Sequence, residues 1–307
     1  MLLHPVTRTD SGAPLIWQDP TDNPMMYNWN QVFMPYCDGA SFSGSNASVT
    51  VHNGTQLHFH GKSVREAVAA SLLAGGMVGT VKAKLSEATD VVISGCSAGG
   101  LATFLHTDQW CDAVSKVKPA AKCVGLPDSG FFLDYQQPGQ PFVPPTRLGS
   151  TIPGDYHRGL QWSYQIQNAS SGINVDCVSA HQSGEHDAWK CMFAEHVSPF
   201  IHSPVFALQS EYDSWQTGHV LGQGDSPAVL GKNLTRRITA NLFHPHPQSG
   251  AFLDSCHHHC GAWNSITIDG DLVSVAFQTW YDGLGMPANK AVWAQGKAYP
   301  CDECCKP

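Results

Sequence analysis

A serine within a glycine-rich segment is the residue of this sequence with the clearest capacity for chemistry. Residues 95–100 read Gly-Cys-Ser-Ala-Gly-Gly and fit the pattern G-x-S-x-G, with Ser97 at its centre. Glycines suit the flanking positions because the chain must turn sharply from a strand into a helix, where side chains would collide. The backbone N–H of Ala98 would then point to the place where an oxyanion develops. The pattern predicts a nucleophilic serine, and a tight turn without chemistry is the alternative.

An activated serine needs a histidine base and a carboxylate that orients this base. On a turn of this kind they follow in the order Ser, Asp/Glu, His. Glu211 and Asp213 come shortly after an apolar run that ends at Leu208, and either suits the acid. Residues 257–259 are three consecutive histidines, whose side chains must point in different directions. At most one of them is expected to be the base, and the residues alone do not say which one.

Short apolar runs alternate with helical patterns around these residues. Residues 90–94, 122–126 and 204–208 are each bounded by turn signals, as is typical of buried parallel strands. Residues 63–74 and 101–110 have the apolar spacing of helices. Alternating strands and helices predict an α/β fold with a mostly parallel sheet and helices on both faces.

The length suits about two domains or one α/β domain equally, and we expect a single domain over residues 1–307. Of these residues 42% are hydrophobic and 14% are charged, which supports a sizeable core and excludes a disordered chain or a coiled coil. Residues 1–25 are expected to be an irregular start, and residues 41–55 an exposed loop. Residues 135–200 lack clear periodicity and are interpreted as an insertion or cap. Residues 296–307 form a Cys-rich tail that we expect to be attached to the body.

Charge and cysteine content limit the partners and the compartment. A net charge of −8 argues against nucleic acid as a partner, and no stretch has the length of a membrane span. Eleven cysteines, scattered singly, favour disulfides over zinc, so no metal is expected. Four sequons support a secreted glycoprotein, at Asn46, Asn53, Asn168 and Asn233. The first residues do not resemble a signal peptide, so either the true start lies upstream or the protein is not secreted.

Several separate blocks follow one another in a fixed order. They include YNWNQVFMPYCDGASFSG at 27–44, LHFHGKSVREAV at 57–68, VISGCSAGG at 92–100, CVGLPDSGFFLD at 123–134, SPVFALQSEYDSWQ at 203–216 and LDSCHHHC at 253–260. This series resembles the pectin acetylesterase / Notum family of serine carboxylesterases, from about residue 23 to the tail. The resemblance implies an α/β-hydrolase-like fold and an esterase without a cofactor.

The resemblance also implies roles for single residues. It makes Ser97 the nucleophile, Asp213 the acid and His259 the base, with Ala98 as an oxyanion-hole donor. Glu211 then becomes a neighbour of the site. The implied activity is the removal of O-acetyl groups from a cell-wall polysaccharide, pectin, through an acyl-enzyme, by a protein that is secreted or lies in the cell wall. A Notum-like deacylase of a lipidated protein is the alternative. The oligomeric state is not predicted.

Aromatic residues and cysteines complete these expectations. Trp29 and Trp215 are candidates for a substrate groove, because aromatic faces stack on sugars, although a packed core position suits each equally. The resemblance implies two disulfides, Cys111–Cys123 and Cys177–Cys191. It also implies that Cys37 is left without a partner.

One departure from the family pattern is important. The family has a Gly-rich strand end, E-G-G-G-W-C, upstream of the YNWN block, and nothing before Asn28 resembles it. We therefore expect a sheet that lacks its first strands and an incomplete oxyanion hole. A truncated family member that is catalytically weak or inactive is a third hypothesis, and losing one oxyanion donor typically lowers the rate by ~10²–10³-fold.

Overall fold

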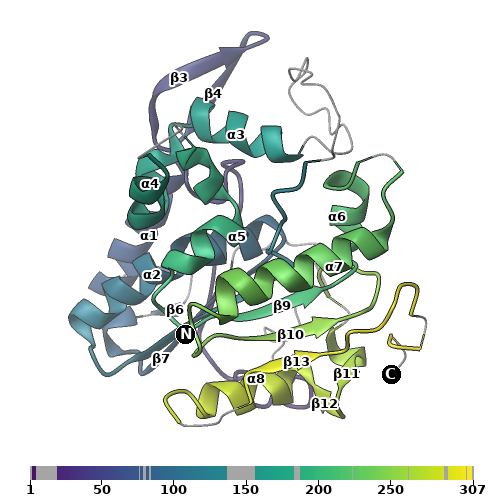
Figure 1. Ribbon diagram of the computed structural model, residues 1–307. Coiled ribbons are helices and arrows are strands. Elements are labelled where there is room, and N and C mark those ends of the chain that lie inside the picture. The colour runs from purple at the N-terminus through teal and green to yellow at the C-terminus, as the bar shows by residue number, and fades with distance from the viewer. Residues whose placement is uncertain are drawn as a thin grey trace.

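A seven-stranded parallel sheet forms the centre of the fold (Figure 1). The structure is a computed structural model that describes residues 2–4, 19–75, 77–78, 81–82, 84–136, 156–182, 187–222, 224–261, 263–286, 290–301 and 303–305. In spatial order the strands are β13 (Val292–Ala294), β10 (Gly250–Asp254), β9 (Phe206–Ser210), β8 (Lys122–Asp128), β7 (Asp90–Cys96), β1 (Leu2–His4) and β2 (Gln31–Phe33). Each neighbouring pair runs parallel, which confirms the predicted fold class.

The central strands form where short apolar runs predict them. β7 and β8 cover the predicted segments completely, β9 begins two residues later than predicted, and most residues of the three strands are buried. Strands covered by helices on both faces bury successive side chains on opposite sides, so the sequence reads as a continuous apolar run. In β9 the side chain of Phe206 packs on one face with Trp280, whereas that of Ala207 belongs to the core on the other face.

Helices cover both faces of the sheet. α2 (Ala98–Val117), α5 (Ala194–Val197) and α7 (Pro227–Ile238) pack on one face, and α8 (Val273–Asp282) packs on the other, as Figure 1 shows. α1 (Gly61–Ala74) ends at Gly75, whose φ of 79° gives the left-handed conformation that a C-terminal glycine favours. Among the described residues no helix is both long and apolar enough to cross a membrane.

Short helices make up the described part of the expected insertion or cap. They are α3 (Tyr156–Ile166), η3 (Ala169–Gly172), α4 (Val175–Gln182), η4 (Ala188–Met192), α5 and η5 (Ser198–Phe200), with residues 137–155 and 183–186 outside the described residues. Most of these elements have one or two turns, which is too short for a periodic apolar pattern to appear in the sequence.

The chain start and the segment 41–55 differ from expectation. Residues Leu2–His4 form β1, which pairs with β7 on one side and β2 on the other, so this side of the sheet is not empty. The edge of β7 offers backbone groups that even a short apolar segment can pair with. The expected exposed loop is instead a hairpin of β3 (Asn46–His52) and β4 (Thr55–Phe59), preceded by a buried segment.

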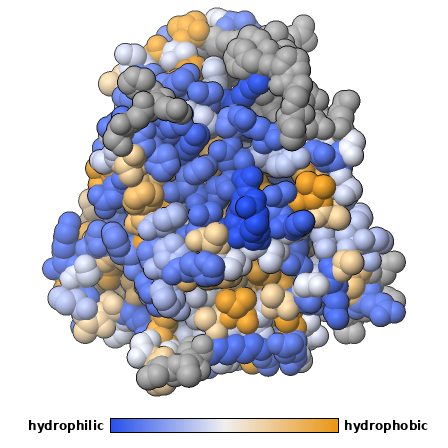
Figure 2. All heavy atoms as spheres, viewed as in Figure 1, coloured by the Kyte–Doolittle hydropathy of each residue, from blue (hydrophilic) through white to orange (hydrophobic). Residues whose placement is uncertain are grey.

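The remaining elements are short. They are β5 (Met77–Val78), β6 (Val81–Lys82), η2 (Leu85–Glu87), α6 (Ser214–His219), η6 (Thr239–Phe243), η7 (Trp263–Ser265), β11 (Thr267–Ile268) and β12 (Asp271–Leu272). The C-terminal tail is attached to the body by the disulfide Cys256–Cys305. On the face seen in Figure 2, apolar residues form small separate patches among hydrophilic ones.

Candidate active site

Ser97 occupies the sharp turn between β7 and α2. Its backbone has φ 58° and ψ −120°, which lies in a region that residues other than glycine rarely adopt. The turn is fixed on both sides, because the Ser97 N–H donates to the carbonyl of Asp128 at 2.9 Å and its carbonyl accepts from Leu101 N–H at 2.9 Å. Strain that surrounding bonds maintain in this way is typical of a functional residue.

Close backbone approaches explain the glycines after the serine. A Cβ added to Gly100 would lie 2.3 Å from the Asp128 carbonyl oxygen and 2.9 Å from Gly130 Cα. Any side chain at Gly100 would therefore separate α2 from the end of β8. Ala98 is the first residue of α2, so its backbone N–H has no acceptor within the helix and lies at the positive end of the helix dipole.

Asp213 follows β9 and caps the first turn of α6. Its side chain is fully buried, and Oδ1 accepts from Gln216 N–H at 2.8 Å. Its Oδ2 accepts from His259 Nδ1 at 2.8 Å and from Gln209 Nε2 at 3.2 Å. The carboxylate is thereby held by three donors in one orientation, as the acid of a serine triad requires.

His259 lies on the loop after β10, and it is the histidine that reaches Asp213. With Nδ1 bonded to Asp213, the ring presents Nε2 as an acceptor; this atom is buried and has no hydrogen-bond partner among the described residues. A disulfide joins Cys96 to Cys260, which are the neighbours of Ser97 and His259 in the sequence. The nucleophile turn and the base loop are therefore tied together covalently.

The other candidates for the acid and the base are held elsewhere. Glu211 is buried and accepts from the hydroxyls of Thr235 and Ser255. His257 is exposed, with Nε2 3.2 Å from Thr217 Oγ1. The geometry thus separates candidates that the residues alone left equivalent.

Asp128 supports the turn from beneath. It is buried and accepts from Ser129 Oγ and from Trp263 Nε1. Burial raises the pKa of Asp128 to about 6, while these two hydrogen bonds and the nearby histidines oppose the rise. Ser129 Oγ also accepts from Cys260 N–H at 3.0 Å, so the same network reaches the base loop.

An aromatic wall flanks the base. The ring centroids of Phe132 and Trp215 each lie 6.1 Å from that of His259, and Tyr156 contacts both aromatic rings. Trp215 is therefore beside the site, as expected for a groove residue. Trp29 instead packs against the core on the α8 side of the sheet.

Sequence reasoning missed two supports of the site. Gln209 Oε1 and Gln216 Oε1 accept from the backbone N–H groups of Phe131 and Leu133, which positions the aromatic wall relative to Asp213. The Cys96–Cys260 disulfide was also missed. A cysteine directly beside each of the two motif residues is the signal that could have indicated it.

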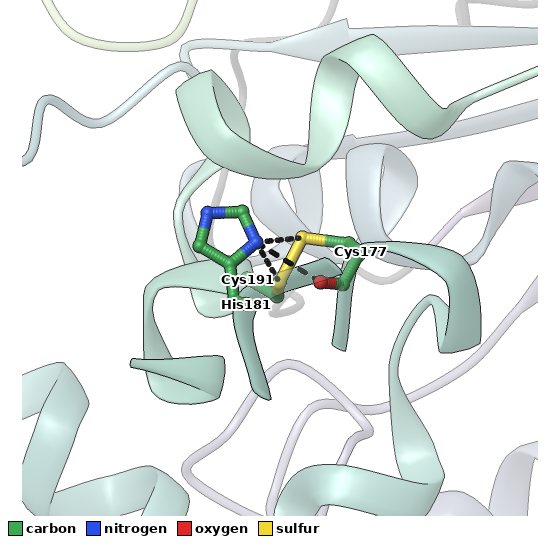
Figure 3. Close-up of side chains that lie close together, drawn as sticks. All are labelled: Cys177, His181 and Cys191. Atoms are coloured by element: carbon green, nitrogen blue, oxygen red, sulfur yellow. Dashed lines mark hydrogen bonds between the residues drawn. A yellow bond between two sulfur atoms is a disulfide. The ribbon is translucent and has the colours of Figure 1, made fainter. Parts of the chain in front are cut away.

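The cysteine pairs implied by the resemblance are present. Disulfides join Cys111 to Cys123 and Cys177 to Cys191, a further one joins Cys301 to Cys304, and Cys37 is free and exposed. Figure 3 shows the Cys177–Cys191 bond with Nδ1 of His181 3.7 and 3.6 Å from its two sulfurs.

Three side-chain groups of the described chain have the composition of metal sites. Two contain the sulfur pairs Cys177/Cys191 and Cys96/Cys260, which are disulfides and so lack the thiolates that bind metal. The third consists of Asp134, Glu195 and His196. There Arg237 donates to both Glu195 oxygens and His196 donates to Asp134, so hydrogen bonds already satisfy these groups.

The four sequons differ in accessibility. Asn53 and Asn168 lie exposed, with positive φ angles of 48° each. Asn46 donates to the Ile166 carbonyl and accepts from Ser48 N–H. Asn233 lies within α7 and donates to a carbonyl of its own helix.

Sequence comparisons find known proteins that resemble this chain. A sequence model of the family described as pectinacetylesterase matches residues 7–229. Pectin acetylesterase 5 of Arabidopsis thaliana is 31% identical over 94% of this chain, which spans 66% of that protein. Human palmitoleoyl-protein carboxylesterase NOTUM is 27% identical over 89% of this chain, which spans 53% of its length.

A solved structure has the same fold. The Wnt deacylase Notum from Drosophila superimposes with a TM-score of 0.70 and 20% sequence identity, over 92% of this chain and 83% of that one. At this identity the similarity concerns the fold.

Proposed function

This chain belongs to the pectinacetylesterase family, and from that premise we propose that it is a serine carboxylic ester hydrolase that removes O-acetyl groups from a cell-wall polysaccharide such as pectin. The hydrogen bond between His259 and Asp213 is the observation that carries the proposal. It leaves Nε2 of His259 as an acceptor on a loop that a disulfide ties to the turn of Ser97.

The proposed reaction proceeds through an acyl-enzyme. Ser97 Oγ attacks the ester carbonyl while His259 Nε2 takes its proton, and Asp213 stabilises the imidazolium that forms. The N–H of Ala98, at the start of α2, donates to the oxyanion. His259 then returns the proton to the departing sugar alcohol, and water hydrolyses the acyl group from Ser97 by the same steps in reverse. These steps use only side chains and backbone groups of the protein.

The aromatic wall favours a short acyl group. Trp215 packs edge to face against Phe132 and Tyr156 beside His259, and the rings of Phe132 and Tyr156 are tilted to each other, with ring centroids 5.1 to 5.4 Å apart. Rings in such contact leave little space between them for a long chain. An acetyl ester fits this arrangement, and the outer faces of the rings suit a sugar.

Two alternatives remain as hypotheses. A deacylase of a lipidated protein would use the same apolar wall to bind a fatty acyl chain, and the similarity to human NOTUM supports it. A weak or inactive family member would follow if Ala98 acts as a single oxyanion donor, since each missing donor reduces the rate by ~10²–10³-fold.

The disulfides support a proposed location outside the cell. Five of them are present in the described residues, and such bonds persist in oxidising compartments. An extracellular or cell-wall location would bring the protein to an acetylated polysaccharide.

A series of aryl esters from acetyl to palmitoyl tests the proposal. We expect the acetyl ester to have the highest kcat/KM, and acetylated pectin to release acetate. Ser97→Ala should abolish both activities. Ser115→Ala alters an exposed serine elsewhere on α2, whose hydroxyl donates to the Asp112 carbonyl, and should leave them unchanged. A preference for palmitoyl esters would support the deacylase, and equal rates for Ser97→Ala and the unmodified chain would refute a serine esterase.

A further inference from the structure

A second histidine–carboxylate pair lies directly beside the candidate triad. His258 Nε2 is 3.1 and 3.0 Å from the two carboxylate oxygens of Asp254, the last residue of β10. The Asp254 side chain is fully buried, and that of His258 is 12% exposed. The proposed reaction uses neither residue, although both belong to the segment that carries His259.

Three buried carboxylates surround this position. Asp128 approaches from the end of β8, Asp213 from the start of α6, and Asp254 from β10, with exposed fractions of 1%, 0% and 0%. His258 and His259 are the titratable bases that act on Asp128. Buried carboxylates are costly unless hydrogen bonds and a nearby cation compensate them, so a charged imidazole beside Asp254 is favourable here.

The charge on His258 follows from its partners. Burial by itself would lower the pKa of this ring, but the hydrogen bond and charge of Asp254, together with Asp128 and Asp213, raise it above the ordinary histidine value. His258 therefore keeps its proton at a pH at which an ordinary histidine has lost it.

His258 also connects the segments that carry the triad. Its carbonyl accepts from Ser214 N–H at 3.0 Å, immediately after Asp213. Its ring meets Trp263 edge to face at 4.8 Å, and Trp263 Nε1 donates to Asp128, whose carbonyl holds the Ser97 N–H. Through its ring and its backbone carbonyl, this one residue contacts the supports of the base, the acid and the nucleophile.

We propose that His258 is a positioning residue: as a cation paired with Asp254 it holds the loop 255–260 so that His259 meets Asp213. The proposal rests on the esterase function proposed above. Loss of the proton from His258 removes the charge that balances the buried Asp254 carboxylate, which keeps its hydrogen bond from Cys256 N–H, and the loop shifts. The esterase rate should therefore fall on the alkaline side as His258 titrates, and this fall should disappear when residue 258 cannot titrate.

His258→Gln tests this, because glutamine retains an N–H donor but carries no charge. We expect kcat for an aryl acetate to fall by about 10- to 100-fold at neutral pH, with KM changed little, because a small displacement of the base has an effect of this size. The alkaline limb should vanish, because glutamine cannot titrate. Asp254→Asn should reproduce the loss of the alkaline limb.

His257→Gln is the matched control, since this neighbouring ring is exposed and contacts the Thr217 hydroxyl. It should keep the pH profile of the unmodified chain. A His258→Gln variant with its alkaline limb unchanged, whether or not its rate is reduced, would overturn the proposal, because a merely structural ring would lower the rate without moving the profile.

Imidazole proton NMR separates failure of this proposal from failure of the esterase function. The His258 signal should titrate above the ordinary histidine range in the unmodified chain and return toward that range in Asp254→Asn. The N–H signal of the His259–Asp213 bond should broaden in His258→Gln. These results would support the positioning role even if no ester were hydrolysed, and an ordinary His258 titration with an unchanged N–H signal would refute it.

Discussion

Replacing Cys96 and Cys260 together with alanine is expected to lower both the stability and the esterase rate. Their disulfide joins the residue before Ser97 to the residue after His259, so it constrains the unfolded chain and also sets the distance between nucleophile and base. A disulfide in another part of the chain should affect stability alone. Cys111–Cys123 provides this comparison, because it joins α2 to β8.

The loop lengths give the expected magnitudes. For sequence separations of 164 and 12, the chain-entropy relation gives about 5 and about 3 kcal/mol of lost stability. The rate depends on geometry instead. If the freed base loop moves by ~1 Å, kcat should fall by about 100-fold, whereas the Cys111/Cys123 variant should keep its rate.

Denaturant unfolding and aryl acetate hydrolysis under non-reducing conditions measure the two effects separately. The Cys96/Cys260 variant should show the larger drop in unfolding free energy and be the slower of the two variants. Full activity in a folded Cys96/Cys260 variant would show that the noncovalent network of Asp128 and Ser129 suffices to hold the base. An equal loss of rate in both variants would refute a local role for the disulfide.

Three further outcomes are expected. Gly100→Ala should abolish activity and lower the melting temperature, measured by calorimetry, because its Cβ would lie 2.3 Å from the Asp128 carbonyl oxygen. Burial alone would raise the pKa of Asp134, but hydrogen bonds from two histidines hold this pKa well below its usual range. The carboxylate therefore stabilises the fold above the ordinary Asp pKa, and this stabilisation is lost as the pH falls below that value. Acid unfolding of Asp134→Asn should be less steep than that of the unmodified chain. Expressed in a secretory host, the chain should carry a glycan at exposed Asn53 but not at Asn233 within α7, which peptide mass spectrometry would check.

The family assignment and much of the fold could be predicted from local sequence. Local sequence patterns predict the turn at 95–100 and the buried strands β7, β8 and β9. Glycines occur where the chain bends, and apolar runs occur where both faces of a strand are covered. The hairpin of β3 and β4 was missed, because its polar residues read as a loop and its pairing depends on the partner strand.

The site was only partly predictable. The order of Ser97, the acid and the histidines follows from the sequence, and the resemblance favoured Asp213 and His259. Only the tertiary structure places His259 Nδ1 at 2.8 Å from Asp213 and directs Glu211 to other partners. Neighbouring residues of one loop have the same local signals, so the direction of each side chain depends on what packs around it.

The sequence by itself determined a glycine-flanked serine at a strand-to-helix turn, an α/β fold and a cysteine content suited to disulfides. The tertiary structure decided which cysteines meet, which tryptophan lies beside the base and which histidine is paired with Asp254. Trp215 and Trp29 look alike in sequence, yet one contacts His259 and the other packs on the opposite side of the sheet. The contacts of Trp215 with His259 and of Cys96 with Cys260 join residues far apart in the chain, so they exist only once the parallel strands have brought their carboxyl ends to one edge of the sheet.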